Sequence, residues 1–182
     1  MPDRLDMKMA AKEQIKGNIG ILAVLMIISA LITGTGIGSI FSPALFSGMC
    51  LVYIGLTSGY KPTIMDLFKR INIFGRAFWL AFLTSLFTIL WSLLFIVPGI
   101  IKGISYSMGL YILAENPDWT ARECIKESKR IMKGNIGKFF VLALSFIPWY
   151  LLCSVTFGIA IIYVYPYVNA TIANFYNSIK DL

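Results

Sequence analysis

Long apolar stretches alternate with shorter polar ones along this chain. A helix that crosses a bilayer needs about 20 mostly apolar residues, and somewhat fewer when flanking side chains reach the interface. The pattern therefore predicts an all-α polytopic membrane protein with six transmembrane helices. Their expected bounds are Asn18–Thr33, Ile37–Ser58, Arg76–Val97, Gly99–Ala114, Lys138–Phe157 and Gly158–Phe175.

The predicted spans follow one another in pairs with almost no linker. The links read TGTGIG (33–38), VPGI (97–100) and TFGI (156–159). Glycine and proline interrupt helices and permit a tight reversal. We therefore expect one integral membrane domain over residues 1–182, built from three helical hairpins in units of about 1–58, 59–114 and 115–182.

The charged residues lie almost entirely between these pairs. Residues 1–17, 59–76, 115–138 and 176–182 hold every Asp and Glu and all but one of the 16 Lys and Arg residues. Because Lys and Arg are retained on the cytoplasmic side, both termini and both long loops are expected to be cytoplasmic. The predicted location is the cell membrane, with multiple passes.

The polar segments have a helical periodicity of their own. In residues 61–75 the apolar Ile64, Leu67, Phe68 and Ile71 follow an i, i+3, i+4, i+7 spacing. This spacing predicts an amphipathic helix on the cytoplasmic surface of the membrane. The start of the chain, RLDMKMAAKEQIKG, predicts another such helix.

Residues 117–133 predict the most strongly charged surface helix. Thr120 and Glu123 have the spacing of a capping box at a helix start. Ala121, Cys124, Ile125, Ser128 and Met132 make one face. The basic side consists of Arg122, Lys126, Lys129, Arg130 and Lys133. Two interpretations are open: a contact with anionic lipid headgroups, or docking of the acidic surface of a protein partner.

The sequence KGNIG occurs twice, at residues 16–20 and 133–137, and NIFGRAF at 72–78 is a degenerate third copy. Each copy lies where a surface helix meets an outward span, which predicts a parallel repeat of three units. We expect the glycine to adopt a left-handed turn and the asparagine to cap the new helix. The residues of this corner motif are Gly17, Asn18, Asn72, Gly75, Gly134 and Asn135. A ligand site at the three asparagines is the alternative.

Composition agrees with a membrane protein and disfavours several kinds of catalysis. The chain is 58% hydrophobic and 14% charged, with a formal net charge of +7 and no histidine. Metal-dependent chemistry favours histidine or clustered carboxylates, which the predicted spans lack. We therefore expect no enzyme activity, no cofactor and no metal site, and we assign the positive charge to headgroup contacts rather than to nucleic acid.

Two polar residues in the spans are candidate lipid or ligand contacts. Lys102 is the one charged residue away from the inner boundary, and Asn169 lies in the last span among tyrosines. Lys102 could extend to the outer headgroups, or bind an ion or substrate. A pairing of Lys102 with Ser105 or Ser107 is a weaker catalytic alternative. The small residues Gly99, Gly103 and Ser107 favour close helix packing.

Several motifs carry a family resemblance. They are PGIIKGISYSM, ILAENPD and IKESKRIMKG within residues 98–140, PYVNATIANFY at 166–176 and GYKPTIMDLF at 59–68. The chain resembles a bacterial family of multi-pass membrane proteins catalogued as domain of unknown function number nine hundred seventy-five. More loosely, it is similar to the membrane domain found beside some glycerophosphodiester phosphodiesterases. The resemblance implies a six-span helical fold and implies no activity.

These features together predict a non-enzymatic accessory, scaffold or protective protein of the bacterial cytoplasmic membrane. Its expected partners are membrane lipids, with anionic headgroups at the cytoplasmic face, and a membrane protein partner or further copies of itself. The alternative is a small transporter, channel or lipid-handling protein. A water-filled cavity lined by Lys102, Asn169 and tyrosines would favour that alternative.

Overall fold

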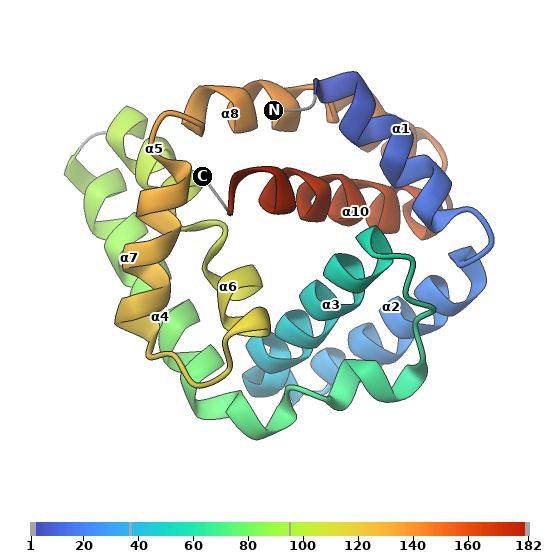
Figure 1. Ribbon diagram of the computed structural model, residues 1–182, viewed down its shortest axis with the longest axis horizontal. Helices are drawn as coiled ribbons and strands as arrows, with labels where there is room; N and C mark the ends of the chain where they lie inside the picture. The colour runs from blue at the N-terminus through green and yellow to red at the C-terminus, as the bar shows by residue number, and fades with distance from the viewer. Residues whose placement is uncertain (1–2, 37, 95, 181–182) are drawn as a thin grey trace.

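A computed structural model describes residues 3–36, 38–94 and 96–180, and every regular element in these ranges is a helix. Figure 1 shows the arrangement. The α-helices are α1 (Arg4–Ile15), α2 (Ile19–Gly34), α3 (Ser42–Thr57), α4 (Phe74–Leu94), α5 (Ile96–Tyr106), α6 (Gly109–Glu115), α7 (Ala121–Met132), α8 (Ile136–Leu144), α9 (Ile147–Val155) and α10 (Ile161–Ile179). The 3₁₀ helices are η1 (Gly38–Phe41), η2 (Ile64–Phe68) and η3 (Ile71–Ile73).

The number of helices that could cross a membrane is four or five, where the sequence predicted six. Four helical runs are long and apolar enough: Gly38–Thr57, Ile64–Leu93, Val97–Glu115 and Ile136–Val155. Helices α1 and α2, bent by 89° at the break between them, make a fifth if they are counted together. These helices are compatible with a multi-pass membrane protein.

Helix α10 accounts for part of the difference. Its 19 residues are long enough to span, but asparagines and tyrosines make it less apolar than the four runs above. It is instead the central helix of the fold, with buried residues along most of its length. Helix α3 packs against both α6 and α10, and α1 and α2 also pack against α10 (Figure 1).

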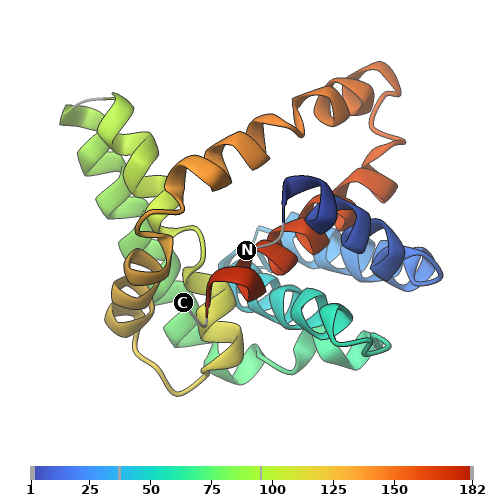
Figure 2. The ribbon, with the colours of Figure 1, turned by 45° about the horizontal axis from the view of Figure 1, so that its top comes forward.

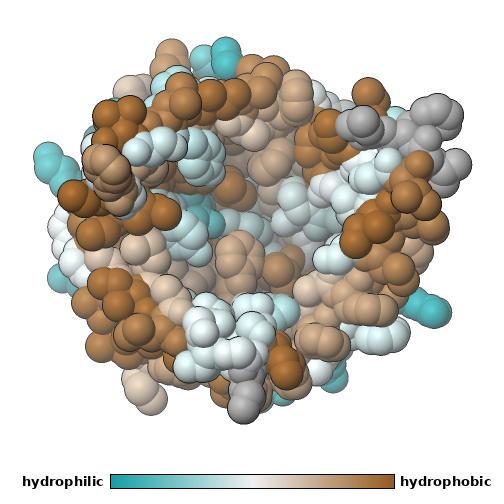
Figure 3. Space-filling view, turned by 180° about the vertical axis from the view of Figure 1, so that it is seen from behind, coloured by the Kyte–Doolittle hydropathy of each residue, from teal (hydrophilic) through white to brown (hydrophobic). Residues whose placement is uncertain are grey.

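Two apolar elements project from this centre. Helices α4 and α5 form a hairpin, and α8 and α9 form a bent arm (Figure 2). Only 17% of the most apolar window of the run Ile64–Leu93 is buried, and 11% of that of Ile136–Val155. Figure 3 shows the face opposite that of Figure 1, hollowed at its centre and rimmed by strongly apolar side chains. Such a surface is stable in contact with lipid and unfavourable in water.

The expected amphipathic helix over residues 61–75 is not a continuous α-helix. The segment forms η2 and η3, and the first begins with a capping box between Thr63 and Asp66. Leu67 is fully buried, whereas Ile64 and Ile71 are 43% and 42% exposed. Two short 3₁₀ turns cannot keep the 3.6-residue period, so only part of the predicted apolar stripe faces the core.

Of the predicted turns, the one at residues 156–159 is present and the one at residues 97–100 is not. Pro98 and Gly99 lie inside α5, whereas the TFGI turn separates α9 from α10, with positive φ at Phe157 and Gly158. The TGTGIG turn includes Ile37, which lies outside the described residues. Pro43 lies in the first turn of α3, where proline fits without bending the helix, while Pro166 is inside α10.

Candidate functional site

The most polar exposed feature is the basic side of α7, which we call the basic surface: Arg122, Lys126, Lys129, Arg130 and Lys133. All five residues are exposed. The opposite side of the helix buries the predicted face of Ala121, Cys124, Ile125, Ser128 and Met132, together with Ile131. The face that the sequence predicted is therefore the buried face of α7, and the five cations are exposed.

Two contacts join α7 to α5, and a capping box closes its first turn. The Thr120–Glu123 capping box is present, as the sequence predicted. The Ser128 hydroxyl donates a buried 2.7 Å hydrogen bond to the Ser105 carbonyl oxygen. The Lys129 ammonium lies 5.3 Å from the centre of the Tyr106 ring. Helix α7 packs against α4, α5 and α6, and Lys129 of the basic surface reaches back to α5.

Local hydrogen bonds lower the pKa of two carboxylates on α7. The Thr120 backbone N–H and hydroxyl lower the pKa of Glu123, and the Arg130 guanidinium, which donates to both oxygens of Glu127, lowers the pKa of Glu127. Both side chains therefore stay ionised below the ordinary glutamate range. Arg130 is partly neutralised by this pair, so Arg122, Lys126 and Lys133 supply most of the available positive charge.

We expect acid to weaken α7 through these two carboxylates. A lowered folded-state pKa means that the stabilisation is present at neutral pH and is lost as the pH falls through about 4 and below. The melting temperature in detergent should therefore fall between pH 6 and pH 3. The double variant Glu123→Gln/Glu127→Gln keeps hydrogen-bond acceptors at both positions and cannot titrate, so its fall should be smaller. An identical pH dependence in the variant would contradict this assignment.

The two KGNIG copies form nearly identical corners. Gly17 and Gly134 have φ of +89° and +83°, and each follows a lysine with φ near −63° and extended ψ. The next residues, Asn18 and Asn135, have φ of −110° and −109°. The backbone therefore has the same conformation at the α1–α2 and α7–α8 junctions. The predicted left-handed conformation of the glycine is confirmed at both.

The asparagines act differently from the prediction. Neither side chain caps the helix that follows. Instead, the Asn18 amide donates to the Gln14 carbonyl oxygen at 3.1 Å, and the Asn135 amide donates to the Ile131 carbonyl oxygen at 3.0 Å. Each asparagine thus satisfies a carbonyl in the last turn of the preceding helix, which supports a corner role over a ligand site.

The third copy does not form this corner. Asn72 lies within η3 and Gly75 lies in the first turn of α4, without the positive φ of the other two glycines. The extra residue in NIFGRAF places Phe74 where the turn glycine would be needed. The prediction of a third KGNIG-type corner was therefore wrong.

Replacing Gly134 by alanine should destabilise the protein by about 1–2 kcal/mol, because the left-handed conformation places a Cβ against the following carbonyl. Gly134→Asn should cost less, since asparagine tolerates this region better. Gly137→Ala is the matched control: this residue is helical with open space around it, so alanine should be neutral or slightly stabilising. Denaturant unfolding in detergent measures all three, and equal stability of Gly134→Ala and the native protein would refute the claim.

The structure does not bring Lys102 and Asn169 together. The Lys102 ammonium lies 5.0 Å from the centre of the Trp91 ring, within the α4–α5 hairpin. The Asn169 amide donates to the Tyr165 carbonyl oxygen of its own helix. The cavity that would have favoured a transporter is therefore not formed by these two residues. The Ser105 and Ser107 hydroxyls also donate to carbonyl oxygens of α5, those of Ile101 and Ile104.

The predicted small-residue packing has its partner within the same chain. A Cβ at Gly99 would overlap Ser92 of α4, and a Cβ at Gly103 would lie 3.4 Å from the Thr88 methyl group. The side of α5 that carries Gly99 and Gly103 therefore packs against α4.

A cavity that the sequence did not predict lies where α2, α3, α6 and α10 converge with α4. This central cavity has a volume of about 640 Å³. Apolar side chains dominate its lining, with the polar exceptions Ser29, Thr33, Ser42 and Tyr165. The Ser29 and Thr33 hydroxyls donate to carbonyls of α2. The cavity is therefore suited to a hydrocarbon chain.

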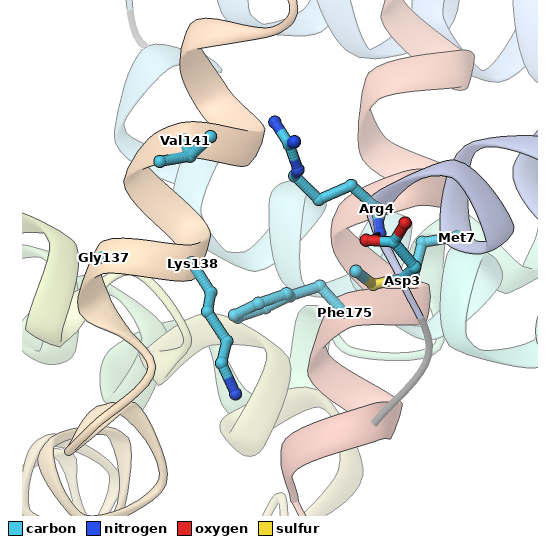
Figure 4. A pocket seen from close by; sticks show the side chains of 7 residues that line it. All are labelled: Asp3, Arg4, Met7, Gly137, Lys138, Val141 and Phe175. Atoms are coloured by element: carbon cyan, nitrogen blue, oxygen red, sulfur yellow. Dashed lines mark hydrogen bonds between the residues drawn. The ribbon is translucent and has the colours of Figure 1, made fainter.

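A second pocket, of about 480 Å³, lies beside the α7–α8 corner (Figure 4). Arg4 and Lys138 extend toward opposite ends of this corner pocket, and the Phe175 ring lies between them. Met7 and Val141 complete its apolar lining, and Asp3 adds one carboxylate. The pocket thus combines cationic and apolar groups.

Comparison with known proteins gives one match. Residues 95–182 match the family model described as protein of unknown function (DUF975). No curated protein and no solved structure matches the chain. The matched segment contains the PGIIK, ILAENPD, IKESKRIMKG and PYVNATIANFY motifs, whereas GYKPTIMDLF lies outside it. The looser likeness to the phosphodiesterase-associated domain remains a prediction. Residues 95–182, slightly less than half of the chain, are therefore similar to the DUF975 family of proteins of unknown function.

Proposed function

We propose that this protein is a multi-pass protein of the bacterial cytoplasmic membrane that acts by binding, as an accessory, scaffold or protective protein, and not by catalysis. The observation that carries the proposal is the basic surface of α7, exposed on one side of a fold whose outer hairpin and arm are apolar. Cations near a membrane surface attract anionic headgroups by about 1 kcal/mol each. Arg4 and Lys138 at the corner pocket are two further cations of the fold.

In the proposed topology six helical segments cross or enter the bilayer and both termini are cytoplasmic. Helices α1 and α7 and the 3₁₀ helix η2 each begin with a capping box and lie before an apolar element, which supports a common surface position. The exposed tip between α9 and α10, where Phe157 is 98% exposed, would then lie on the outer side.

The packing order also supports a parallel repeat of three units. η2 packs against α3 of the first unit, α7 packs against α6 of the second, and α1 packs against α10 of the third. The outward helices follow the same rule, because α4 contacts α3, α8 contacts α5 and α2 contacts α10. Each unit therefore packs against the returning helix of the unit before it, and the first unit packs against that of the third.

Single-cysteine labelling tests the topology, in a background without the three native cysteines. A membrane-impermeant maleimide should label Lys126→Cys only from the cytoplasmic side and Phe157→Cys only from the outer side of intact cells. Labelling of both positions from one side would overturn the proposed orientation.

A lipid-enrichment experiment tests the binding role. The protein is reconstituted in bilayers of phosphatidylcholine and phosphatidylglycerol, excised with its nearest lipids by an amphipathic polymer, and the lipids are quantified. We expect phosphatidylglycerol enrichment, lost in Arg122→Gln/Lys126→Gln/Lys133→Gln and kept in the control Lys16→Gln/Lys61→Gln. No enrichment, or enrichment unaffected by the first variant, would contradict anionic-lipid binding. A stoichiometric acidic protein from native membranes, bound only with the basic surface intact, would reassign this surface to a partner.

The central cavity favours a second candidate function, lipid handling. Its size and apolar lining suit an acyl chain, and its lining extends from Thr33 and Ser42 at one end to Met49 on α3. A fluorescent fatty acid should bind the purified protein, and Ala30→Trp, which fills the cavity, should abolish binding. Binding that survives this substitution would exclude the cavity as the site.

A further inference from the structure

The central cavity has no charged side chain among the described residues that line it. Four of these residues carry a hydroxyl group, and all the others are apolar; the four are Ser29, Thr33, Ser42 and Tyr165. An ionised headgroup in such a cavity would lose its water and meet no opposite charge, which is costly. The lining therefore disfavours phosphate, carboxylate and ammonium groups.

Two of the hydroxyl groups keep only their acceptor sites for a ligand. The Ser29 hydroxyl donates to the Leu25 carbonyl oxygen at 2.8 Å, and the Thr33 hydroxyl donates to the Ser29 carbonyl oxygen at 2.8 Å. A hydroxyl group has one proton and two lone pairs, so each of these oxygens can still accept a hydrogen bond. Because Ser29 and Thr33 are four positions apart on α2, they lie on the same face of the helix. They suit a ligand group that donates a hydrogen bond.

The cavity has a polar end and an opening to the surface. Thr33 is the next-to-last residue of α2 and Ser42 is the first residue of α3, the helix that follows along the chain. Met49, at the apolar end, lies seven positions further along α3, about 10 Å along the helix axis. Ala30 and Ile161 line the cavity and are exposed, which gives it an opening at α2 and the start of α10.

We propose that the central cavity binds an uncharged lipid with a free hydroxyl group, the class of long-chain alcohols and diacylglycerols. The ligand hydroxyl donates to the Ser29 or Thr33 oxygen, and a hydrocarbon chain extends along α3 toward Met49. This inference rests on the lipid-handling function proposed above and adds the class of its ligand. It does not depend on the basic surface of α7.

Displacement of a fluorescent fatty alcohol from the full chain in uncharged detergent tests the preference for a neutral headgroup. The competitors are hexadecanol and hexadecyl sulfate, which have the same chain, and each is expressed as its mole fraction in the micelle. Hexadecanol should displace the probe at a mole fraction at least about tenfold lower. Equal potency, or tighter binding of the sulfate, would overturn the inference and leave lipid handling in place. No saturable binding of the probe would overturn both.

Hexadecyl methyl ether tests the donated hydrogen bond, because it is uncharged and has no hydroxyl proton. A hydrogen bond contributes about 0.5–1.5 kcal/mol, so the ether should bind about 2–10-fold more weakly than hexadecanol. Equal binding of the ether and the alcohol would contradict donation to the cavity.

The double variant Ser29→Ala/Thr33→Val assigns this hydrogen bond to its acceptors. Hexadecanol and the ether should bind this variant equally. The matched control is Thr84→Val/Ser154→Ala, whose hydroxyl groups also donate to carbonyl oxygens of their own helices but do not line the cavity. The control should keep the preference for the alcohol. If the preference persists in Ser29→Ala/Thr33→Val, the proposed acceptors are wrong.

Discussion

Replacing Gly48 by alanine is expected to destabilise the protein by about 3 kcal/mol, the upper part of the range for overpacking a core. Gly48 lies in the buried middle of α3, where η2 crosses it. An added Cβ would overlap the Leu67 carbonyl oxygen and lie 3.0 Å from its carbon. These are backbone atoms, so no side-chain rotation relieves the contact, and η2 must move away from α3.

The matched control for this substitution is Gly20→Ala. Gly20 is also helical, in α2, but a Cβ there meets no atom within 4 Å. Alanine at this position should leave stability unchanged or raise it by about 0.5–1 kcal/mol. Denaturant unfolding in detergent compares both variants with the native protein. A native-like Gly48→Ala would mean that η2 does not rest on α3 at this point.

Replacing Phe146 by alanine should cost about 3–5 kcal/mol of docking energy and release α9 from the bundle. Phe146 and Leu142 are the two buried apolar residues in the arm Ile136–Val155. The Phe146 ring packs edge-on against Tyr167, with centroids 5.6 Å apart, and the Lys8 ammonium lies 4.5 Å from its centre. The same ammonium donates to the Ser145 carbonyl oxygen at 3.2 Å.

Hydrogen exchange with mass spectrometry distinguishes release of the arm from global unfolding. In Phe146→Ala the peptides covering α9 should exchange faster, while those covering α3 and α6 keep their protection. Leu151→Ala removes a side chain of similar size that is 62% exposed, and it should leave the exchange unchanged. Equal protection of α9 in both variants would show that Phe146 does not anchor the arm.

Sequence reasoning succeeded where a feature depends on neighbouring residues. The capping box at Thr120, the apolar face of α7 and the left-handed Gly17 and Gly134 all follow from short-range chemistry. It failed at Gly75, because the extra residue in NIFGRAF places this glycine in the first turn of α4. It also predicted one amphipathic helix where Thr63 and Asp66 close a local 3₁₀ turn instead.

Features that depend on several distant segments could not be predicted. The central cavity requires five helices to converge, and no residue pattern along one helix encodes the gap between them. Two reciprocal hydrogen bonds link the side-chain amides of Gln14 and Asn174, which are 160 positions apart in the sequence.

The contact between α1 and α10 has a consequence for biosynthesis. Met7, Ala11 and Ile15 are the buried residues of α1, and α10 is its main partner. At translation rates of about 5–20 residues per second, α10 is made roughly 7–30 s after α1. During that interval the ribosome-bound chain exposes this small apolar stripe without its partner. The buried face of α1 therefore gains its main partner only after the last helix has been made.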